Sequence, residues 1–349
     1  MIKYLGSKRR LVGQLGALLT ASGATTALDL FTGTTRVAQE FCRRGAEVTA
    51  VDTASYSEIL AQCYVATPAE TMDPAEIEQA LARLAGLPDR RGYVTEVFAE
   101  RARYFHPRNA VRIDAIREGI DELYPDGPLR PIVLTALLEA ADAVDSTVGV
   151  QMAYLKQWAP RALRPLRLRA PVLTPGPGRA LRQDALMAVK ELEPVGLAYL
   201  DPPYNQHRYF NNYHVWETLV RWDAPEYFGV AHKRMDARDD VNRSAFNSRR
   251  TMPAALAEVI AQVRAEVVVV SFSDEGFLPI EALVEMLAMR GQPVEVLAFD
   301  TRRYIGSVIG IYSPDGVKVG SEGHHRNTEY LLVSAPPDLL PALARAALA

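Results

Sequence analysis

One stretch of the sequence decides the fold: Gly196-Leu197-Ala198-Tyr199-Leu200-Asp201-Pro202-Pro203-Tyr204. Its first five residues are apolar without alternation, which predicts a parallel β-strand that is covered on both faces. The tetrapeptide from Asp201 to Tyr204 then falls at the carboxyl end of this strand. Open α/β sheets bind their ligands at that edge. The tetrapeptide is therefore a candidate binding site.

These four residues suit a flat ring that carries an exocyclic amino group. Asp201 offers a carboxylate acceptor, and Pro202 and Pro203 offer backbone carbonyls with no competing N–H donors. Tyr204 offers an aromatic face for stacking. The alternative is a simple turn at the end of a strand, because proline is common in loops. The aromatic fourth residue and the segments upstream favour the ring-binding interpretation.

A nucleoside-type site is indicated upstream. Residues 26–31 and 47–51 predict two strands, and residues 36–44 predict the helix between them. Gly33 and Asp52 are nineteen positions apart, close to the ~20 found where a carboxylate binds ribose hydroxyls. Because no Gly-x-Gly-x-x-Gly is present, this unit favours a nucleoside over a dinucleotide. Plain α/β packing is the alternative.

Residues 57–175 predict a helical insertion into the α/β series. Their apolar residues recur at helical spacing, for example over 111–123 and 132–143, and no strand pattern interrupts them. We expect residues 1–56 and 176–349 to form one discontinuous domain and residues 57–175 to form another. Strands over 266–272, 294–303 and 329–334 would complete the sheet, the last two as antiparallel strands. Asp184 precedes a helix and is either its N-cap or an acceptor for an amino group.

Two stretches are locally basic. Arg161, Arg164, Arg167 and Arg169 have no acid between them, and nearby prolines predict an exposed, non-helical segment that could lie along phosphates. A solvated edge is the alternative. The second stretch, residues 229–251, includes groups that suit base edges, namely Arg243, Asn247, Ser248 and Arg249. Because the 349-residue chain has a net charge of −3, any surface for nucleic acid must be local.

The remaining features predict an ordinary cytoplasmic protein. Cys42 and Cys63 are too few for a zinc cluster, so no metal site is expected and both are interpreted as free buried thiols. Lys8-Arg9-Arg10 and the apolar residues after it imitate a signal peptide, but glycines interrupt the run. No stretch approaches the ~20 apolar residues of a membrane span.

The motifs together resemble the Dam-related N6-adenine DNA methyltransferase family. They are, in order, Lys3-Tyr4-Leu5-Gly6-Ser7-Lys8, Asp29-Leu30-Phe31-Thr32-Gly33, Asp52, Asp184 and Asp201-Pro202-Pro203-Tyr204. Residues 270–276 and 327–331 are similar to the branch associated with type IIS restriction-modification systems. One departure is Thr35, where the family often has glycine.

The resemblance implies a Rossmann-like class I methyltransferase fold with a seven-stranded, mostly parallel sheet. It implies S-adenosylmethionine as methyl donor, bound by Tyr4, Lys8, Asp29, Phe31, Gly33, Thr34, Asp52, Asp184 and Asp201. Asp201-Pro202-Pro203-Tyr204 would hold an adenine flipped out of double-stranded DNA. The helical insertion would recognise the DNA target, with Arg164, Arg167, Arg243, Asn247, Ser248 and Arg249 as DNA contacts. A cognate restriction endonuclease is a further expected partner.

Three other functions fit the same motifs. Enzymes that methylate adenine in RNA share the catalytic tetrapeptide, although the long insertion favours DNA. Enzymes that methylate the amino group of cytosine more often have serine in place of Asp201. A non-catalytic nucleic-acid-binding module would not need an intact Asp201 and Tyr204.

Overall fold

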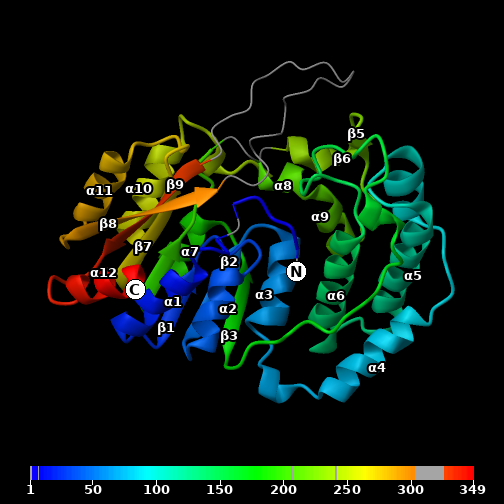
Figure 1. Cartoon of the computed structure of the whole chain (residues 1–349), viewed down its shortest axis with the longest axis horizontal. Coiled ribbons are helices and arrows are strands. Elements are labelled where there is room, and N and C mark those ends of the chain that lie inside the picture. Colours follow the sequence, from blue (N-terminus) through cyan, green and yellow to red (C-terminus); the bar gives the residue numbers. More distant parts are fainter. Residues whose placement is uncertain (1, 7, 206–207, 240–241, 303–325) are drawn as a thin grey trace.

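The computed structural model describes residues 2–6, 8–205, 208–239, 242–302 and 326–349. Within these residues the chain forms a seven-stranded sheet in the order β3-β2-β1-β4-β7-β9-β8 (Figure 1). Its strands are β1 (Thr26–Asp29), β2 (Glu47–Asp52), β3 (Gly178–Arg182), β4 (Val195–Leu200), β7 (Ala265–Ser273), β8 (Val294–Arg302) and β9 (Arg326–Ser334). β9 runs antiparallel to β7 and β8, and the other pairs are parallel. The expected fold class is confirmed.

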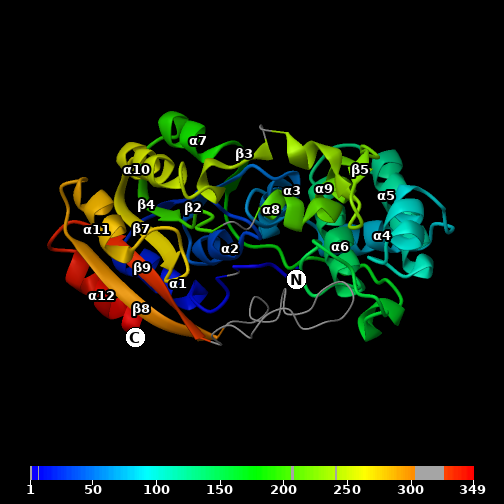
Figure 2. The same ribbon diagram turned by 90° about the horizontal axis from the view of Figure 1, so that it is seen from above.

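Helices cover both faces of this sheet (Figure 2). One face carries α1 (Val12–Ser22), α2 (Arg36–Arg43) and α12 (Leu340–Leu348), and the other carries α7 (Ala185–Glu191), α10 (Met252–Gln262) and α11 (Ile280–Ala288). We call the sheet and these helices the sheet lobe.

The strand that the opening stretch predicts is β4, at the centre of the sheet. Leu197 and Tyr199 point into the core under α1 and α2, and Ala198 and Leu200 point into the core under α7 and α10. Successive side chains of a strand face opposite sides. A central strand covered on both sides therefore has to be apolar at every position, as this one is.

A second lobe, mostly helical, lies beyond the β3 edge of the sheet (Figure 1). It contains α4 (Pro74–Ala85), a π-helix (Val94–Arg101), α5 (Pro107–Leu123) and α6 (Leu129–Ala143), then from a later segment α8 (Tyr209–Asn212), α9 (His214–Arg221), β5 (Tyr227–Phe228) and β6 (Lys233–Arg234). We call these elements the helical lobe. Short 3₁₀ turns lie at Ala69–Thr71, Pro160–Leu163, Met235–Arg238 and Ala245–Asn247.

The two segments of the helical lobe are bonded to each other. Tyr93 donates its hydroxyl to the carbonyl of Pro225 (2.7 Å), and Arg117 donates Nε to the carbonyl of Leu219 (2.6 Å). As the sequence indicates, residues 57–175 contain no strand. The lobe nevertheless extends past residue 175, because the segment with α8 and α9 returns to it.

The expected border at residue 56 falls inside α3 (Ser55–Tyr64). This helix packs against β2 and β3 on one side and against α6 and α9 on the other. α3 therefore joins the two lobes, and the division into two domains at residues 56 and 175 remains a prediction. The first helix begins at Val12, because Lys8 to Leu11 form a turn closed by a hydrogen bond from the Leu11 N–H to the carbonyl of Lys8 (2.8 Å). Ser7 and Arg303, which belong to expected segments, lie outside the described residues.

Both cysteines are free and buried, as expected. Burial raises the pKa of Cys42 to about 11 and that of Cys63 to about 12, so both thiols are protonated and unreactive at neutral pH. None of the described helices combines the length and the hydrophobicity that crossing a membrane requires.

Candidate active site

A cavity opens at the carboxyl edge of the sheet, where β1, β2 and β4 end. Its walls include Tyr4, Phe31, Asp52, Tyr56, Asp184, Asp201, Pro203, Tyr209, Arg243, Phe246 and Asn247. The structure thus brings together six of the residues expected at the cofactor and catalytic sites, although they are spread over 200 positions of sequence. This edge is where parallel α/β sheets place their ligands.

Gly33 lies in the turn beside the cavity, and two features require glycine there. Its φ is 50°, a left-handed value that side chains disfavour. A Cβ atom would also lie 3.0 Å from the ring of Tyr4. The Gly33 N–H donates to Asp52 (2.9 Å to Oδ2), so the turn and the carboxylate at the end of β2 are held together.

Thr35 adopts a glycine-like backbone where the family often has glycine. Its φ is 61°, which costs ~1–2 kcal/mol for a residue with a Cβ atom. Its hydroxyl donates to the carbonyl of Thr34 (2.7 Å) and accepts from Nε2 of Gln39 (2.9 Å). These bonds offset the strain, and the departure from glycine leaves the left-handed conformation in place.

Asp29 supports the same turn from beneath and does not line the cavity. Its Oδ2 accepts the hydroxyl of Thr32 (2.9 Å) and the N–H of Ala38 (3.1 Å). Burial raises the pKa of Asp29 to about 7, which these hydrogen bonds partly oppose. Asp29 therefore shapes the loop. Thr34, also expected to contact the cofactor, is buried in this turn and lies outside the cavity lining.

Lys8 is paired with the catalytic candidate Asp201. Its Nζ lies 3.2 Å from Asp201 Oδ1 and 2.9 Å from Glu329 Oε2, and the residue is only 7% exposed. Burial alone would lower the pKa of Lys8, but Asp201, Tyr204 and Glu329 outweigh it and hold that pKa well above its usual value. The structure thus pairs Lys8 with Asp201 of the candidate tetrapeptide, whereas the sequence suggested a contact with the cofactor.

Asp201 responds to the same neighbours. Burial raises its pKa to about 6, Lys8 lowers the pKa, and Glu329 raises it. A carboxyl group that titrates near 6 is mostly ionised at neutral pH and can accept hydrogen bonds. This is the state that an acceptor for an amino group requires.

Tyr204 lies next to this ion-pair cluster. Its ring is 5.3 Å from that of Phe272, and Lys8 Nζ is 5.2 Å from its ring centre. Its hydroxyl is 3.5 Å from Glu329 Oε1, the outer limit of a hydrogen bond. The ring is therefore fixed mainly by packing and by the cation.

The residues expected to contact DNA lie in different places. Arg164 and Arg167 line a separate, larger cavity between the lobes. Arg243 and Asn247 line the active-site cavity. Ser248 and Arg249 follow directly but lie outside that lining; Ser248 accepts the N–H of Arg250 (3.3 Å), and Arg249 lies 5.6 Å from the ring centre of Phe277.

Two arginines of the basic stretches are occupied by ion pairs within the protein. Arg161 is paired with Asp145 (2.6 Å). Arg234 is 2% exposed and is paired with Asp223 (2.7 Å) and Asp236 (2.8 Å). The clustering of arginines in the sequence did not indicate that Arg161 and Arg234 would be paired with acidic residues of the protein.

The residues at the site that the sequence did not indicate include Tyr56 and Tyr209, which line the cavity, and Glu329, which is paired with Lys8. Of these three, Glu329 is the most distant from its partner in sequence. It lies 321 positions from Lys8, the residue it binds. The only signal was its place in Asn327-Thr328-Glu329-Tyr330-Leu331, a segment that resembles the family but to which no role was attached. β9 is antiparallel to β7, and this pairing carries Glu329 to the edge where β4 ends.

Comparison with known proteins agrees with this geometry. The modification methylase LlaI of Lactococcus lactis subsp. lactis is 26% identical over 324 residues, which cover 87% of this chain and 51% of that protein. The type II methyltransferase M.NlaIII of Neisseria lactamica is 27% identical over 318 residues (87% and 92%), and M.FokI of Planomicrobium okeanokoites is 26% identical over 313 (84% and 47%). The chain thus spans about half the length of LlaI and M.FokI and most of M.NlaIII.

Among solved structures, a precorrin-6y C5,15-methyltransferase from Geobacter metallireducens has a TM-score of 0.30 at 11% identity, covering 96% of this chain and 93% of that one, which is too distant to support an argument. The family match is decisive, because it extends over residues 4–286, well over half of the sequence. The chain belongs to the D12 class N6 adenine-specific DNA methyltransferase family.

Proposed function

We propose that this chain transfers a methyl group from S-adenosylmethionine to the N6 amino group of an adenine at a specific site in double-stranded DNA. The observation that carries this proposal is the position of Asp201. It ends the central strand, lines the same cavity as Asp52 and Asp184, and adjoins Tyr204. Asp52 and Asp184 thus offer acceptors for a nucleoside, and Asp201 and Tyr204 offer an acceptor and an aromatic ring for a base.

The residues of the cavity fit S-adenosylmethionine. The carboxylate of Asp52 would accept the ribose hydroxyls, that of Asp184 the adenine amino group, and Phe31 and Phe246 would pack against the adenine ring. When bound, this cofactor supplies an electrophilic methyl group on a sulfonium. The free volume of about 150 Å³ is below the ~300–1,000 Å³ of most ligand sites. We therefore expect the cavity to widen when the cofactor binds.

The target adenine would enter beside Tyr204. Its amino group is out of reach inside the duplex, so the base has to leave the stack. Asp201 and the carbonyl of Pro202 would accept hydrogen bonds from the amino group and orient its lone pair toward the methyl group. Tyr204 would stack on the ring. Because alignment of two reactants can supply several kcal/mol, the chain needs no covalent intermediate.

The biological setting is proposed from the relatives. LlaI is a modification methylase, and M.NlaIII and M.FokI are type II methyltransferases. We infer that this chain has the same role, protecting DNA against a cognate restriction endonuclease in the cytoplasm.

The proposal is tested by methyl transfer from labelled S-adenosylmethionine to unmethylated duplex DNA, with the product nucleoside identified by mass spectrometry. N6-methyladenine in a reproducible sequence context is the expected product. N4-methylcytosine, or a preference for RNA over duplex DNA, would replace the proposal with one of its rivals. Cofactor binding without transfer to any nucleic acid would indicate a non-catalytic module.

Asp52→Asn should weaken cofactor binding about tenfold to a hundredfold. The charge-assisted bonds to ribose hydroxyls are worth ~1.5–3 kcal/mol. Asparagine keeps one oxygen, which can accept either the Gly33 N–H or the Ala54 N–H, because these two groups bond to different oxygens of Asp52. Titration calorimetry without DNA measures the effect. Glu47→Gln, at the exposed opposite end of β2, is the matched control and should bind normally. Equal affinities for the two variants would remove Asp52 from the site.

Tyr204→Ala should weaken capture of the flipped base by ~1–3 kcal/mol through loss of stacking. Tyr204→Phe should retain most of the binding, since the hydroxyl makes only a 3.5 Å contact with Glu329. Fluorescence of 2-aminopurine at the target position reports the flipped state. If the phenylalanine variant loses as much as the alanine variant, the hydroxyl and not the ring is the functional group.

A further inference from the structure

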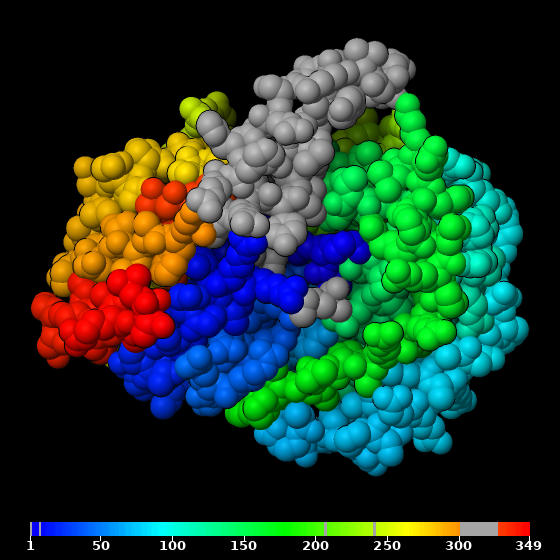
Figure 3. Space-filling model, viewed as in Figure 1, coloured from blue at the N-terminus to red at the C-terminus, as the bar shows by residue number. Residues whose placement is uncertain are grey.

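A second cavity, of about 820 Å³, lies between the two lobes. The space-filling view shows the surface hollowed where the N-terminal part of the sheet lobe meets the segment that returns from the helical lobe (Figure 3). One wall is α2, the other is the extended segment 164–172, and α6 and the end of α3 lie between them.

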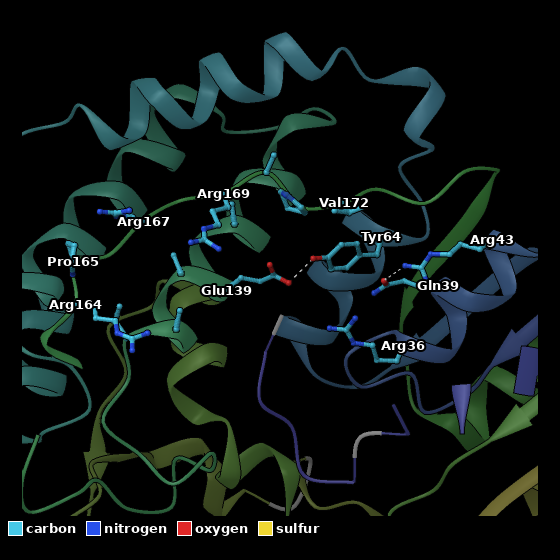
Figure 4. A pocket seen from close by; sticks show the side chains of 16 residues that line it. Arg36, Gln39, Arg43, Tyr64, Glu139, Arg164, Pro165, Arg167, Arg169 and Val172 are labelled. Carbon is cyan, nitrogen blue, oxygen red and sulfur yellow. Dashed lines mark hydrogen bonds between the residues drawn. The ribbon is translucent and has the colours of Figure 1, made fainter. Parts of the chain in front are cut away.

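Arginines dominate this cavity. Arg36 and Arg43 come from α2, and Arg164, Arg167 and Arg169 come from the opposite wall (Figure 4). We call this group of five residues and the cavity they line the arginine cleft. Among the described lining residues, Glu139 is the one carboxylate, and it accepts the hydroxyl of Tyr64 (2.7 Å). A chain with a net charge of −3 thus concentrates five positive charges in one cleft.

Most of these guanidinium groups are not used by the fold. Over the described ranges, the side chains of Arg36, Arg164, Arg167 and Arg169 have no hydrogen bond or ion pair with the protein. Arg161, only three residues before Arg164, is by contrast paired with Asp145. Burial, together with Arg43 and Arg9, lowers the pKa of Arg36 against the opposing effect of Tyr64 and Glu139, and a bound anion would relieve this repulsion.

The sequence favours an extended conformation for residues 164–172, the wall of the cleft that carries Arg164, Arg167 and Arg169. Leu166, Leu168 and Ala170 pack against the core, and Arg167 and Arg169 alternate with them on the exposed side, as in a strand. Pro165 and Pro171 disfavour a helix. The wall is thus preformed, so an anion bound there would not have to order it.

A buried asparagine anchors this wall to α5. Asn109 donates Nδ2 to the carbonyls of Ala162 (3.0 Å) and Arg164 (2.8 Å) and accepts the N–H of Leu166 (3.0 Å). All three bonds go to backbone groups. The arginine side chains are therefore left free for a ligand.

The cleft is close enough to the active site to act on the same DNA. α3 connects them, since Tyr56 near its start lines the active-site cavity and Tyr64 at its end lines the arginine cleft. Eight residues of helix span ~12 Å. One DNA strand carries a phosphate every ~3.4 Å along the axis, so this distance corresponds to roughly three or four nucleotides.

We propose that the arginine cleft binds the phosphodiester backbone of the DNA strand beside the flipped adenine, with contacts from both lobes. This proposal rests on the proposed function. Five arginines on two facing walls match a run of phosphates better than a single small anion. Phosphate contacts fix the register of a protein on DNA without reading sequence. The cleft would thereby position the duplex while the active-site edge engages the base.

The first test uses equilibrium binding of duplex DNA over a range of salt concentrations. Arg167→Gln/Arg169→Gln should make the slope of log K against log salt shallower by about one to two units, at ~0.9 per lost phosphate contact. Arg36→Gln, from the other wall, should remove about one unit. Arg83→Gln/Arg345→Gln is the charge-matched control on exposed positions of α4 and α12 and should leave the slope unchanged. A slope that is equal in all variants overturns the proposal.

The second test places the contact on the DNA. Single methylphosphonate linkages, each of which removes one phosphate charge, are placed in turn along an unmethylated duplex that contains the target adenine. In the wild type we expect loss of affinity at linkages about three or four nucleotides from that adenine, and no loss there in Arg167→Gln/Arg169→Gln. The control variant should keep the wild-type pattern. Sensitivity that persists in the cleft variant overturns the proposal.

These tests are separable from that of the proposed function. If the wild type methylates adenine but the cleft variants bind DNA normally, the cleft inference fails alone. If the cleft variants flatten the salt dependence of duplex binding as expected but the wild type makes no N6-methyladenine, the proposed activity fails and the cleft remains a DNA site. The cleft proposal would be overturned if inorganic phosphate displaced labelled duplex DNA as effectively as unlabelled duplex does. The cleft would then need only a site for a single anion.

Discussion

Asp201→Ala should abolish methyl transfer, lowering the single-turnover rate by at least ~10²–10³-fold. The carboxylate contributes most when positive charge develops on the attacking amino nitrogen, so its loss appears in the rate more than in the affinity for DNA or cofactor. Single-turnover transfer of labelled methyl groups to duplex DNA measures the change.

Asp201→Asn tests whether the carboxylate itself, and not only a side chain of this size, is required. It preserves size but replaces one acceptor oxygen with a donor, so we expect a loss almost as large. The fold should survive either substitution, because Lys8 keeps its 2.9 Å contact with Glu329. Thermal melting and cofactor calorimetry check this. Near-normal rates in either variant would remove Asp201 from the chemistry.

Lys8→Met should shift the pH dependence of kcat/KM to higher pH and depress the rate most strongly below neutrality. Methyl transfer needs the Asp201 carboxylate, whose pKa burial raises to about 6 while Lys8 lowers it. Activity should therefore rise with pH through about 6 in the wild type. Without the cation, the pKa of Asp201 rises further and the acidic limb moves upward. Profiles of kcat/KM report the groups of the free enzyme.

Two further variants distinguish this electrostatic role from a structural one. Lys8→Arg keeps the charge and should restore much of the wild-type profile. Glu329→Gln should move the acidic limb the other way, to lower pH, because Glu329 raises the pKa of Asp201. If all three variants lose activity equally at every pH, the cluster serves the fold and does not tune Asp201.

The parts of the fold that follow from local pattern were predictable. β4, β2 and the helix between β1 and β2 each carry their own signal of periodicity or turn residues, and the carboxyl ends of parallel strands must meet at one edge. Asp201 was placed at this edge for this reason, and Asp52 by its spacing from Gly33, whereas Tyr4 was implied by the resemblance to the family. Family resemblance added the order of the motifs.

What could not be predicted depends on partners far apart in sequence. Glu329 reaches Lys8 only through the antiparallel pairing of β9, and Asp223 reaches Arg234 because α9 and β6 pack together. Arg36 gave no sign of facing Arg167, since one lies on a core helix and the other on a segment 131 positions later. A run of arginines thus says little about which of them are free.

The interleaved construction of the helical lobe has a consequence for synthesis on the ribosome. α6 ends at Ala143, but α9, which packs against it, begins only at His214. At ~5–20 residues per second, roughly 4–14 s pass before the nascent chain can cover this surface. The central strand β4, which precedes Asp201, emerges within that interval. The helical lobe is thus completed only after the central strand of the sheet lobe has emerged, and transplanting residues 57–175 alone into another scaffold would leave the surface of α6 that α9 covers exposed.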